Sequence, residues 1–210
     1  MSEKEKVLQQ ISEIKSHLID RETFFPYNYN ACYVWAIIAT LLTLGMVPAY
    51  EYSITVGTIL LSSFMLLGFV LEHNMIKRVN RDYDIQECTK RQTFITQIFL
   101  MIAIFAILIT IIFATHKLYA PIMLLWLFLI SLGYFAIGFI LNIKLFTQMA
   151  QLNITISFVL LTIAIYFDML KGTESLFFTL TQAVAIFGLA IAPAWVAKQQ
   201  IKKEKEEIGV

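Results

Sequence analysis

The stretch FITQIFLMIAIFAILITIIFA, residues Phe94–Ala114, decides the fold class of this chain. Fourteen of its residues are Ile, Leu or Phe, and each favours insertion into a bilayer by about 0.3–0.6 kcal/mol. The polar members Thr96, Gln97 and Thr110 cannot offset that sum. A helix of about 20 apolar residues crosses the hydrocarbon core of a membrane. The stretch therefore predicts a transmembrane helix.

The rest of the chain has the same character, because 59% of its 210 residues are hydrophobic and only 15% are charged. Soluble domains average about 45–50% apolar and about 25% charged residues. The apolar runs are continuous rather than alternating, so they predict helices and not barrel strands. We expect an all-α integral membrane bundle of six transmembrane helices. The predicted spans are about 31–50, 54–71, 94–114, 121–143, 151–170 and 176–197.

The basic residues predict the orientation of these spans. Fourteen of the sixteen Lys and Arg residues fall in the N-terminal segment, the loop after the second span, the turn after the fourth span and the C-terminal tail. Only Lys117 and Lys171 fall on the other side. The positive-inside rule then places both termini in the cytoplasm. The outer connections are short, so we expect three antiparallel hairpins with no external domain.

We divide the chain into a cytoplasmic amphipathic helix over residues 1–24, a transmembrane domain over 25–197 and a cytoplasmic tail over 198–210. The charged start, Met1–Gln10, lacks the apolar core of a signal peptide, so we expect the first span to direct insertion. In the first segment Val7, Ile11, Ile14 and Leu18 recur at helical spacing and share one face. This face could dock a partner, or it could lie on the membrane surface.

Polar residues inside the spans are mild, and their default role is hydrogen bonding between helices. We expect Gln97, Gln182 and Ser131 to face the interior of the bundle, because an amide that faces lipid is costly. Pro48 and Pro193 can kink the first and last spans. They indicate either a structural kink or a broken-helix binding site.

No motif for catalysis or metal binding can be assembled. Glu51, Glu72 and Asp168 fall at predicted span ends, and the three histidines lie outside the spans. No Cys/His cluster has zinc spacing, and Cys32 and Cys88 are expected to be two free cytoplasmic thiols. We therefore expect no enzyme activity, no catalytic residue, no metal and no cofactor.

The N-terminal segment also carries an Ile-x-x-Ile-Lys pattern over Ile11–Lys15. In this pattern, in its six spans and in the basic loop after the second, the chain resembles a group of uncharacterised bacterial membrane proteins. The resemblance covers the whole chain and implies the six-helix topology. It implies no activity and no site residues. With it, the expected location is the inner (plasma) membrane of a bacterium.

These observations favour a non-catalytic membrane protein that acts as a regulatory or assembly subunit through helix packing and its cytoplasmic segments. The alternative is a small transporter or channel for a neutral or weakly polar solute. A water-accessible groove lined by Gln97 and Gln182 would favour that alternative. Expected partners are membrane lipids, a protein bound through the N-terminal helix, and a second copy of the chain. The net charge of +1 predicts no nucleic acid partner.

Overall fold

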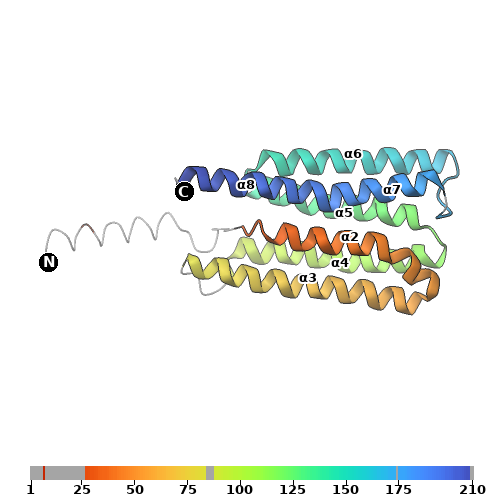
Figure 1. Cartoon of the computed structure of the whole chain (residues 1–210), viewed down its shortest axis with the longest axis horizontal. Coiled ribbons are helices and arrows are strands. Elements are labelled where there is room, and N and C mark those ends of the chain that lie inside the picture. Colours follow the sequence, from red (N-terminus) through yellow and green to blue (C-terminus); the bar gives the residue numbers. More distant parts are fainter. Residues whose placement is uncertain (1–6, 8–26, 84–87, 174, 209–210) are drawn as a thin grey trace.

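The computed structural model describes Val7 and residues 27–83, 88–173 and 175–208. Over these residues the structure is helical and contains no strand, which confirms the predicted all-α class. Six helical stretches are long and apolar enough to cross a membrane, and they run along one common axis (Figure 1). The helices are α2 (Ala31–Tyr52), α3 (Ile54–Asp82), α4 (Lys90–Thr115), α5 (Tyr119–Ile140), α6 (Lys144–Tyr166), α7 (Leu176–Ile186), the π-helix η1 (Phe187–Ile191) and α8 (Ala192–Ile208).

Short connections join the helices into neighbouring pairs. Ser53 alone separates α2 from α3, and its hydroxyl caps α3 by accepting from the Thr55 amide. Thr89 and Gln92 form a reciprocal capping box at the start of α4, which satisfies amides that the helix leaves without partners. The α5–α6 turn contains Asn142 with φ 54°, a conformation that Asn tolerates better than most residues.

Helix α5 is central to the bundle, because it packs against α4, α6, α7 and η1. Helix α2 packs against α3, α7, η1 and α8. The largest fully buried side chains, among them Trp126, Phe146, Leu42 and Met46, come mainly from α2 and α5. The core therefore lies along these two helices, and the other helices surround them.

Two helix boundaries differ from the prediction in ways that matter for function. Helix α3 continues to Asp82, well beyond the predicted span end near Leu71, where a partly helical extension of the span was expected, so Glu72 lies within the helix. Helix α6 begins at Lys144 rather than near Gln151, because the chain turns tightly over 141–143. Asn153, which falls close to the start of the predicted span 151–170, is consequently buried inside the bundle.

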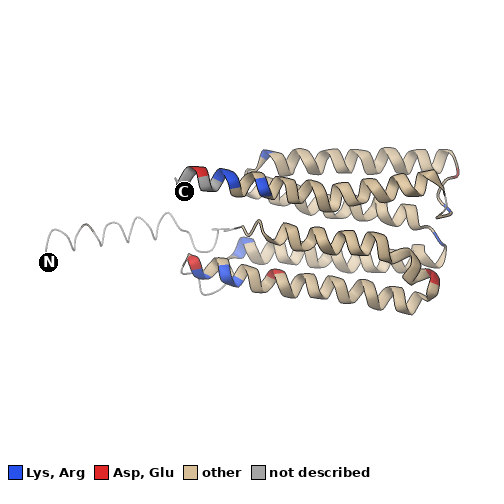
Figure 2. Cartoon of the chain, in the orientation of Figure 1, with Lys and Arg blue, Asp and Glu red and all other residues tan. Residues whose placement is uncertain are grey.

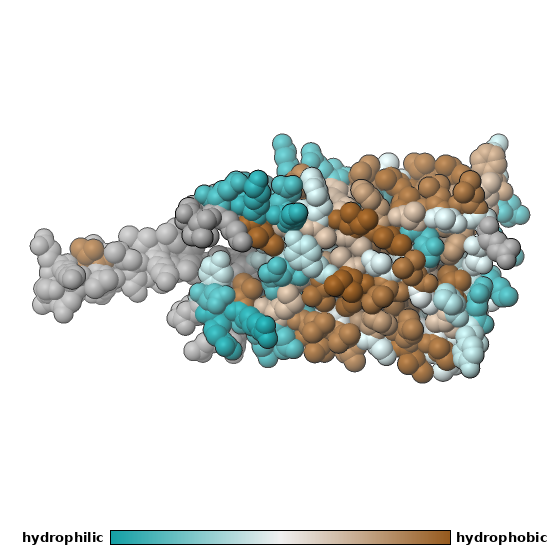
Figure 3. All heavy atoms as spheres, viewed as in Figure 1, coloured by the Kyte–Doolittle hydropathy of each residue, from teal (hydrophilic) through white to brown (hydrophobic). Residues whose placement is uncertain are grey.

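Charge and hydropathy divide the surface along the bundle axis. Lys and Arg gather at the end where α3 and α8 finish and α4 and α6 begin, which we call the basic end (Figure 2). The described side chains there include nine Lys or Arg residues, against Lys117 and Lys171 at the opposite end. Between the two ends the visible face is mostly hydrophobic (Figure 3). Many large apolar side chains of the bundle, such as Leu66, Met101 and Phe139, are exposed.

Candidate functional site: an aromatic cavity around Glu72

A cavity of about 60 Å³ lies inside the bundle, bounded by α2, α3, α4, α5 and η1 and by Tyr27 before α2. Its wall is almost entirely apolar and aromatic, and Glu72 is its one acidic residue. A single buried water needs about 10–15 Å³ of cavity volume, so the cavity can hold a few waters or a small solute. The wall consists of Tyr27, Trp35, Ala39, Met65, Phe69, Glu72, Phe99, Ile102, Ala103, Ala106, Ile130, Tyr134, Ile137 and Leu189.

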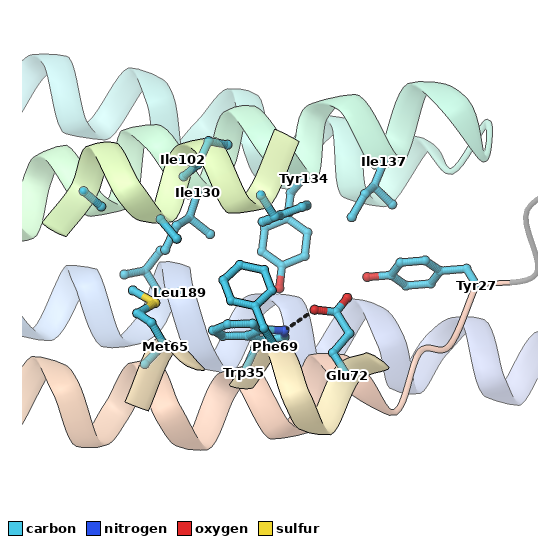
Figure 4. Close-up of a pocket in the computed structure, with 14 residues that line it drawn as sticks. Tyr27, Trp35, Met65, Phe69, Glu72, Ile102, Ile130, Tyr134, Ile137 and Leu189 are labelled. Carbon is cyan, nitrogen blue, oxygen red and sulfur yellow. Dashed lines mark hydrogen bonds between the residues drawn. The ribbon is translucent and has the colours of Figure 1, made fainter. Parts of the chain in front are cut away.

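Glu72 reaches this cavity because of its position on α3. It lies eighteen residues after Ile54, which is about 27 Å along a helix with a rise of 1.5 Å per residue. Its Oε2 accepts a hydrogen bond of 2.9 Å from the indole Nε1 of Trp35 on α2. Figure 4 shows the carboxylate directed into the space between these helices and α5. The carboxyl group is thus half-buried between the helices, on the side nearer the basic end.

Glycine and aromatic contacts hold the Trp35 ring beside α3. A Cβ atom added at Gly68 would lie only 2.6 Å from this ring, so the missing side chain makes room for the indole. The Phe69 ring meets Trp35 edge to face, with centroids 5.3 Å apart, which is a favoured aromatic geometry. The indole is therefore fixed in position to donate to Glu72.

Two phenols are directed at the carboxylate, Tyr27 from the basic-end side and Tyr134 from α5. The hydroxyls of Tyr27 and Tyr134 both point toward Glu72 in Figure 4. The Tyr134 ring stacks on Phe146 with centroids 5.6 Å apart, and Tyr27 meets Phe146 edge to face. The Tyr27 oxygen lies 3.4 Å from the sulfur of Cys32, which is buried. Burial raises the pKa of the Tyr27 phenol well above its ordinary value, so this group stays neutral near pH 7.

No basic side chain among the described residues forms an ion pair with Glu72; its hydrogen-bond partner there is the neutral indole. The nearest basic positions along α3, His73 and Lys77, are exposed. An ionised carboxylate away from water is costly unless a cation or several donors compensate it. Within the described part of the chain, then, only a bound proton or a positively charged guest would neutralise the Glu72 carboxylate.

The π-helix η1 supplies one wall of the cavity through Leu189. A π-bulge leaves the regular hydrogen-bond ladder of a helix, and such bulges are frequent at functional sites. Here the buried Asn153 side chain donates to the Gly188 carbonyl at 3.1 Å. Pro193, which cannot donate to the carbonyl of Leu189, follows one turn later. The irregular backbone thus lies next to the cavity. It belongs to the last span, where the sequence predicts a kink at Pro193.

The three polar residues predicted to face the interior have different positions. Ser131 is fully buried, and its hydroxyl has no hydrogen-bond partner among the described residues. Gln182 is partly buried and donates to the Thr43 carbonyl at 3.0 Å. Gln97 is exposed on the outer face of α4, so this expectation is wrong for the single chain. Neither glutamine contributes to the cavity wall.

The amide that faces inward on α4 is Gln92, which lies just before the start of the predicted span 94–114. It exchanges hydrogen bonds of 3.0 and 2.7 Å with the amide of Asn80, and both side chains are buried. Gln97 follows five residues later and so points to the opposite side of the helix. This buried pair ties the end of α3 to the start of α4 at the basic end.

The predicted docking face of the N-terminal helix falls largely outside the described residues. Val7 is described and is exposed, whereas Ile11, Ile14 and Leu18 lie outside the described ranges. The partner-docking hypothesis therefore stays a prediction.

No family model, no curated protein and no solved structure matches this chain. Function must therefore be argued from the cavity itself.

Proposed function

We propose that this chain is a multi-pass protein of the bacterial inner membrane, with its basic end in the cytoplasm. Six helices long and apolar enough to cross a membrane support this, together with the apolar surface between two polar ends. The excess of Lys and Arg at the basic end supports the orientation. Both chain termini then lie on the cytoplasmic side, and the Glu72 cavity lies in the cytoplasmic half of the bundle.

We further propose that the protein binds a small solute in this cavity and carries it across the membrane. The observation that carries the proposal is a carboxyl group held in an aromatic cavity inside the bundle. Ligand sites are typically apolar concavities with a few placed polar groups, and ionisable groups inside a membrane domain usually mark a solute or ion path. The cavity favours the carrier over a regulatory subunit, since helix packing alone does not require such a site.

The bundle beyond the cavity is tightly packed toward the opposite end. Trp126 donates to Thr110 at 2.8 Å, and both side chains are buried. Met46, Leu61 and Ile122 are also fully buried in this region. This arrangement supports a carrier whose outer half is closed while the cavity lies near the cytoplasmic end.

The test is to fill the cavity from one wall. Ala103 is buried on α4 and lines the cavity, so the isobutyl side chain of Ala103→Leu should occupy the solute space. Ala183→Leu, on the exposed face of α7, adds the same group outside the cavity. The measurement is thermal unfolding of each purified protein with a panel of two- to four-heavy-atom amines, alcohols and carboxylic acids.

A bound solute stabilises the folded state in proportion to RT ln(1 + [L]/Kd). We expect at least one compound to raise the melting temperature of the wild type and of Ala183→Leu but not of Ala103→Leu. Equal stabilisation of all three proteins would place binding elsewhere. A panel without effect on the wild type would contradict the proposed function.

A further inference from the structure

We propose that the solute is a small organic cation, an alkylammonium of a few heavy atoms, and that it binds to Glu72 in exchange for a proton. This inference rests on the proposed solute site and names its chemistry. The juxtaposition that carries it is one carboxylate without a cationic partner among the described residues, inside a cage of aromatic rings.

The positive charge of the solute follows from the cavity wall. Trp35, Phe69, Phe99, Tyr27 and Tyr134 present aromatic rings around the space that contains the carboxylate. The faces of such rings attract ammonium groups through their quadrupoles, most strongly when the contact is removed from water. A carboxylate beside them adds charge complementarity. An anion would be repelled by the carboxylate and by the faces of the rings.

A metal ion fits the site poorly. Hard cations take six or more oxygen ligands, whereas the oxygens at this site come from one carboxylate and two phenols. The described residues also contain no group of three His, Cys, Asp or Glu side chains that could hold a metal. The aromatic wall serves a soft, partly apolar cation and contributes nothing to the coordination of a metal.

The size of the cavity limits the guest. A cavity of 150 Å³ is known to accept benzene, and this one measures about 60 Å³. By proportion it admits two or three heavy atoms, such as methylammonium or ethylammonium. The methyl or ethyl group would lie toward Met65, Ala106 and Leu189, which belong to the apolar part of the wall. Larger ammonium ions would require the helices to move apart.

Exchange with a proton follows from the inventory of charged groups around Glu72. Among the described residues, the titratable groups that face it are Tyr27 before α2, Cys32 on α2 and Tyr134 on α5. The walls contributed by α4 and η1 are apolar, and on α3 itself His73 is exposed. The phenols and the thiol are neutral acids, so none of them can balance a charge on Glu72. Within the described part of the chain, the charge can be balanced only by a proton or by a bound cation.

The exchange step balances. With the cavity empty, Glu72 is a carboxylic acid. When R–NH₃⁺ enters, the O–H bond of the carboxyl group breaks and its proton leaves to bulk water. The carboxylate then pairs with the ammonium group. One positive charge enters and one leaves, so the charge of the site is the same in both states. The proton and the alkylammonium therefore compete for one group.

The experiment uses the purified full chain in detergent, with ethylammonium chloride as the probe and ethanol as its uncharged counterpart. Binding is measured by titration calorimetry, and proton release by a pH indicator in weakly buffered solution. Glu72→Gln removes the ionisable group with little change in shape. Asp168→Asn makes the matched change at an exposed carboxylate at the opposite end.

We expect ethylammonium to bind and to release about one proton per site, and ethanol not to bind. On the acid side of the titration, the affinity should fall about tenfold for each unit by which the pH is lowered, because protons compete with ethylammonium for Glu72. Glu72→Gln should lose at least tenfold in affinity and all proton release, whereas Asp168→Asn should keep both. Proton release by the wild type tests the exchange even if Glu72→Gln does not fold.

The outcomes separate this inference from the function on which it rests. Binding of ethylammonium without proton release and without pH dependence would overturn the exchange. Equal binding of ethanol, or full binding by Glu72→Gln, would overturn the cationic class. In either case the proposed solute site would still be supported if Ala103→Leu abolishes the binding of the probe. No binding by any probe would reject the solute site and this inference together.

Discussion

The Trp35 indole and the Glu72 carboxyl group form the pair on which the site depends. The indole donates to the carboxylate across the α2–α3 contact at 2.9 Å. A hydrogen bond to a group inside a protein is costly to remove, because the remaining partner loses its compensation without regaining water. The same bond aims the carboxylate at the cavity. Stability and solute binding should therefore both respond to a change at Trp35.

Trp35→Phe keeps an aromatic ring but removes the N–H donor, so it should lower the free energy of unfolding by about 1–3 kcal/mol. Trp195→Phe is the matched control, since Trp195 is exposed on α8, and surface changes cost within about 0.5 kcal/mol. Unfolding of both variants in detergent measures the difference. Equal costs for the two tryptophans would show that the bond to Glu72 contributes nothing.

At the residue scale, the sequence could predict which residues are polar but not which of them face one another. Glu72 follows an apolar run and precedes a charged segment, so hydropathy assigns it to a span end. Its interior position depends on the continuation of α3 to Asp82 and on Trp35, thirty-seven residues earlier. A tryptophan one helix away from a carboxylate is a weak sequence signal, because register between the two helices decides whether they meet.

At the scale of the helices, close contact between α2 and α3 depends on two glycines. The Trp35 ring lies against Gly68, and the Tyr50 ring lies against Gly57, where a Cβ would come within 2.5 Å of the ring. Small residues at helix contacts let neighbouring helices approach closely in membrane proteins. The two glycines thus fix the distance between these helices at both ends of their contact.

Gly68→Ala should destabilise the protein by about 1–3 kcal/mol, because its methyl group would displace the Trp35 ring. Gly45→Ala, in α2, is the matched control, since a Cβ there meets nothing within 4 Å. That change should stabilise the helix by about 0.5–1 kcal/mol through lower backbone entropy loss. Thermal unfolding of both variants gives the comparison, and a Gly68→Ala protein as stable as Gly45→Ala would refute the packing argument.

The helices themselves were well predicted, because their apolar runs are long and continuous. All six predicted spans overlap helical stretches. Of the two prolines expected to kink a span, Pro193 follows the irregular segment η1, whereas Pro48 lies within the continuous helix α2. Hydropathy could not give the ends at α3 and α6, since both helices extend through polar residues at the basic end. Tertiary contacts decide these ends, such as the Asn80–Gln92 amide pair and the burial of Phe146.

At the scale of the whole molecule, charge asymmetry and the cavity point in the same direction. Basic side chains gather at one end of an otherwise apolar bundle, and Glu72 lies in the half nearer that end. With the basic end in the cytoplasm, a solute would meet the carboxyl group from the cytoplasmic side. The orientation of the bundle therefore decides which compartment reaches the site in the arrangement seen here.

The most direct test is the accessibility of single cysteines to a membrane-impermeant maleimide. Cys88 is exposed at the basic end and Cys32 is buried; His116→Cys in a Cys88→Ser background places a thiol at the opposite end without changing any Lys or Arg. In intact cells we expect the cysteine at position 116 to react and Cys88 to react only after the membrane is permeabilised. Reaction of Cys88 in intact cells, or of both positions from the same side, would contradict the account.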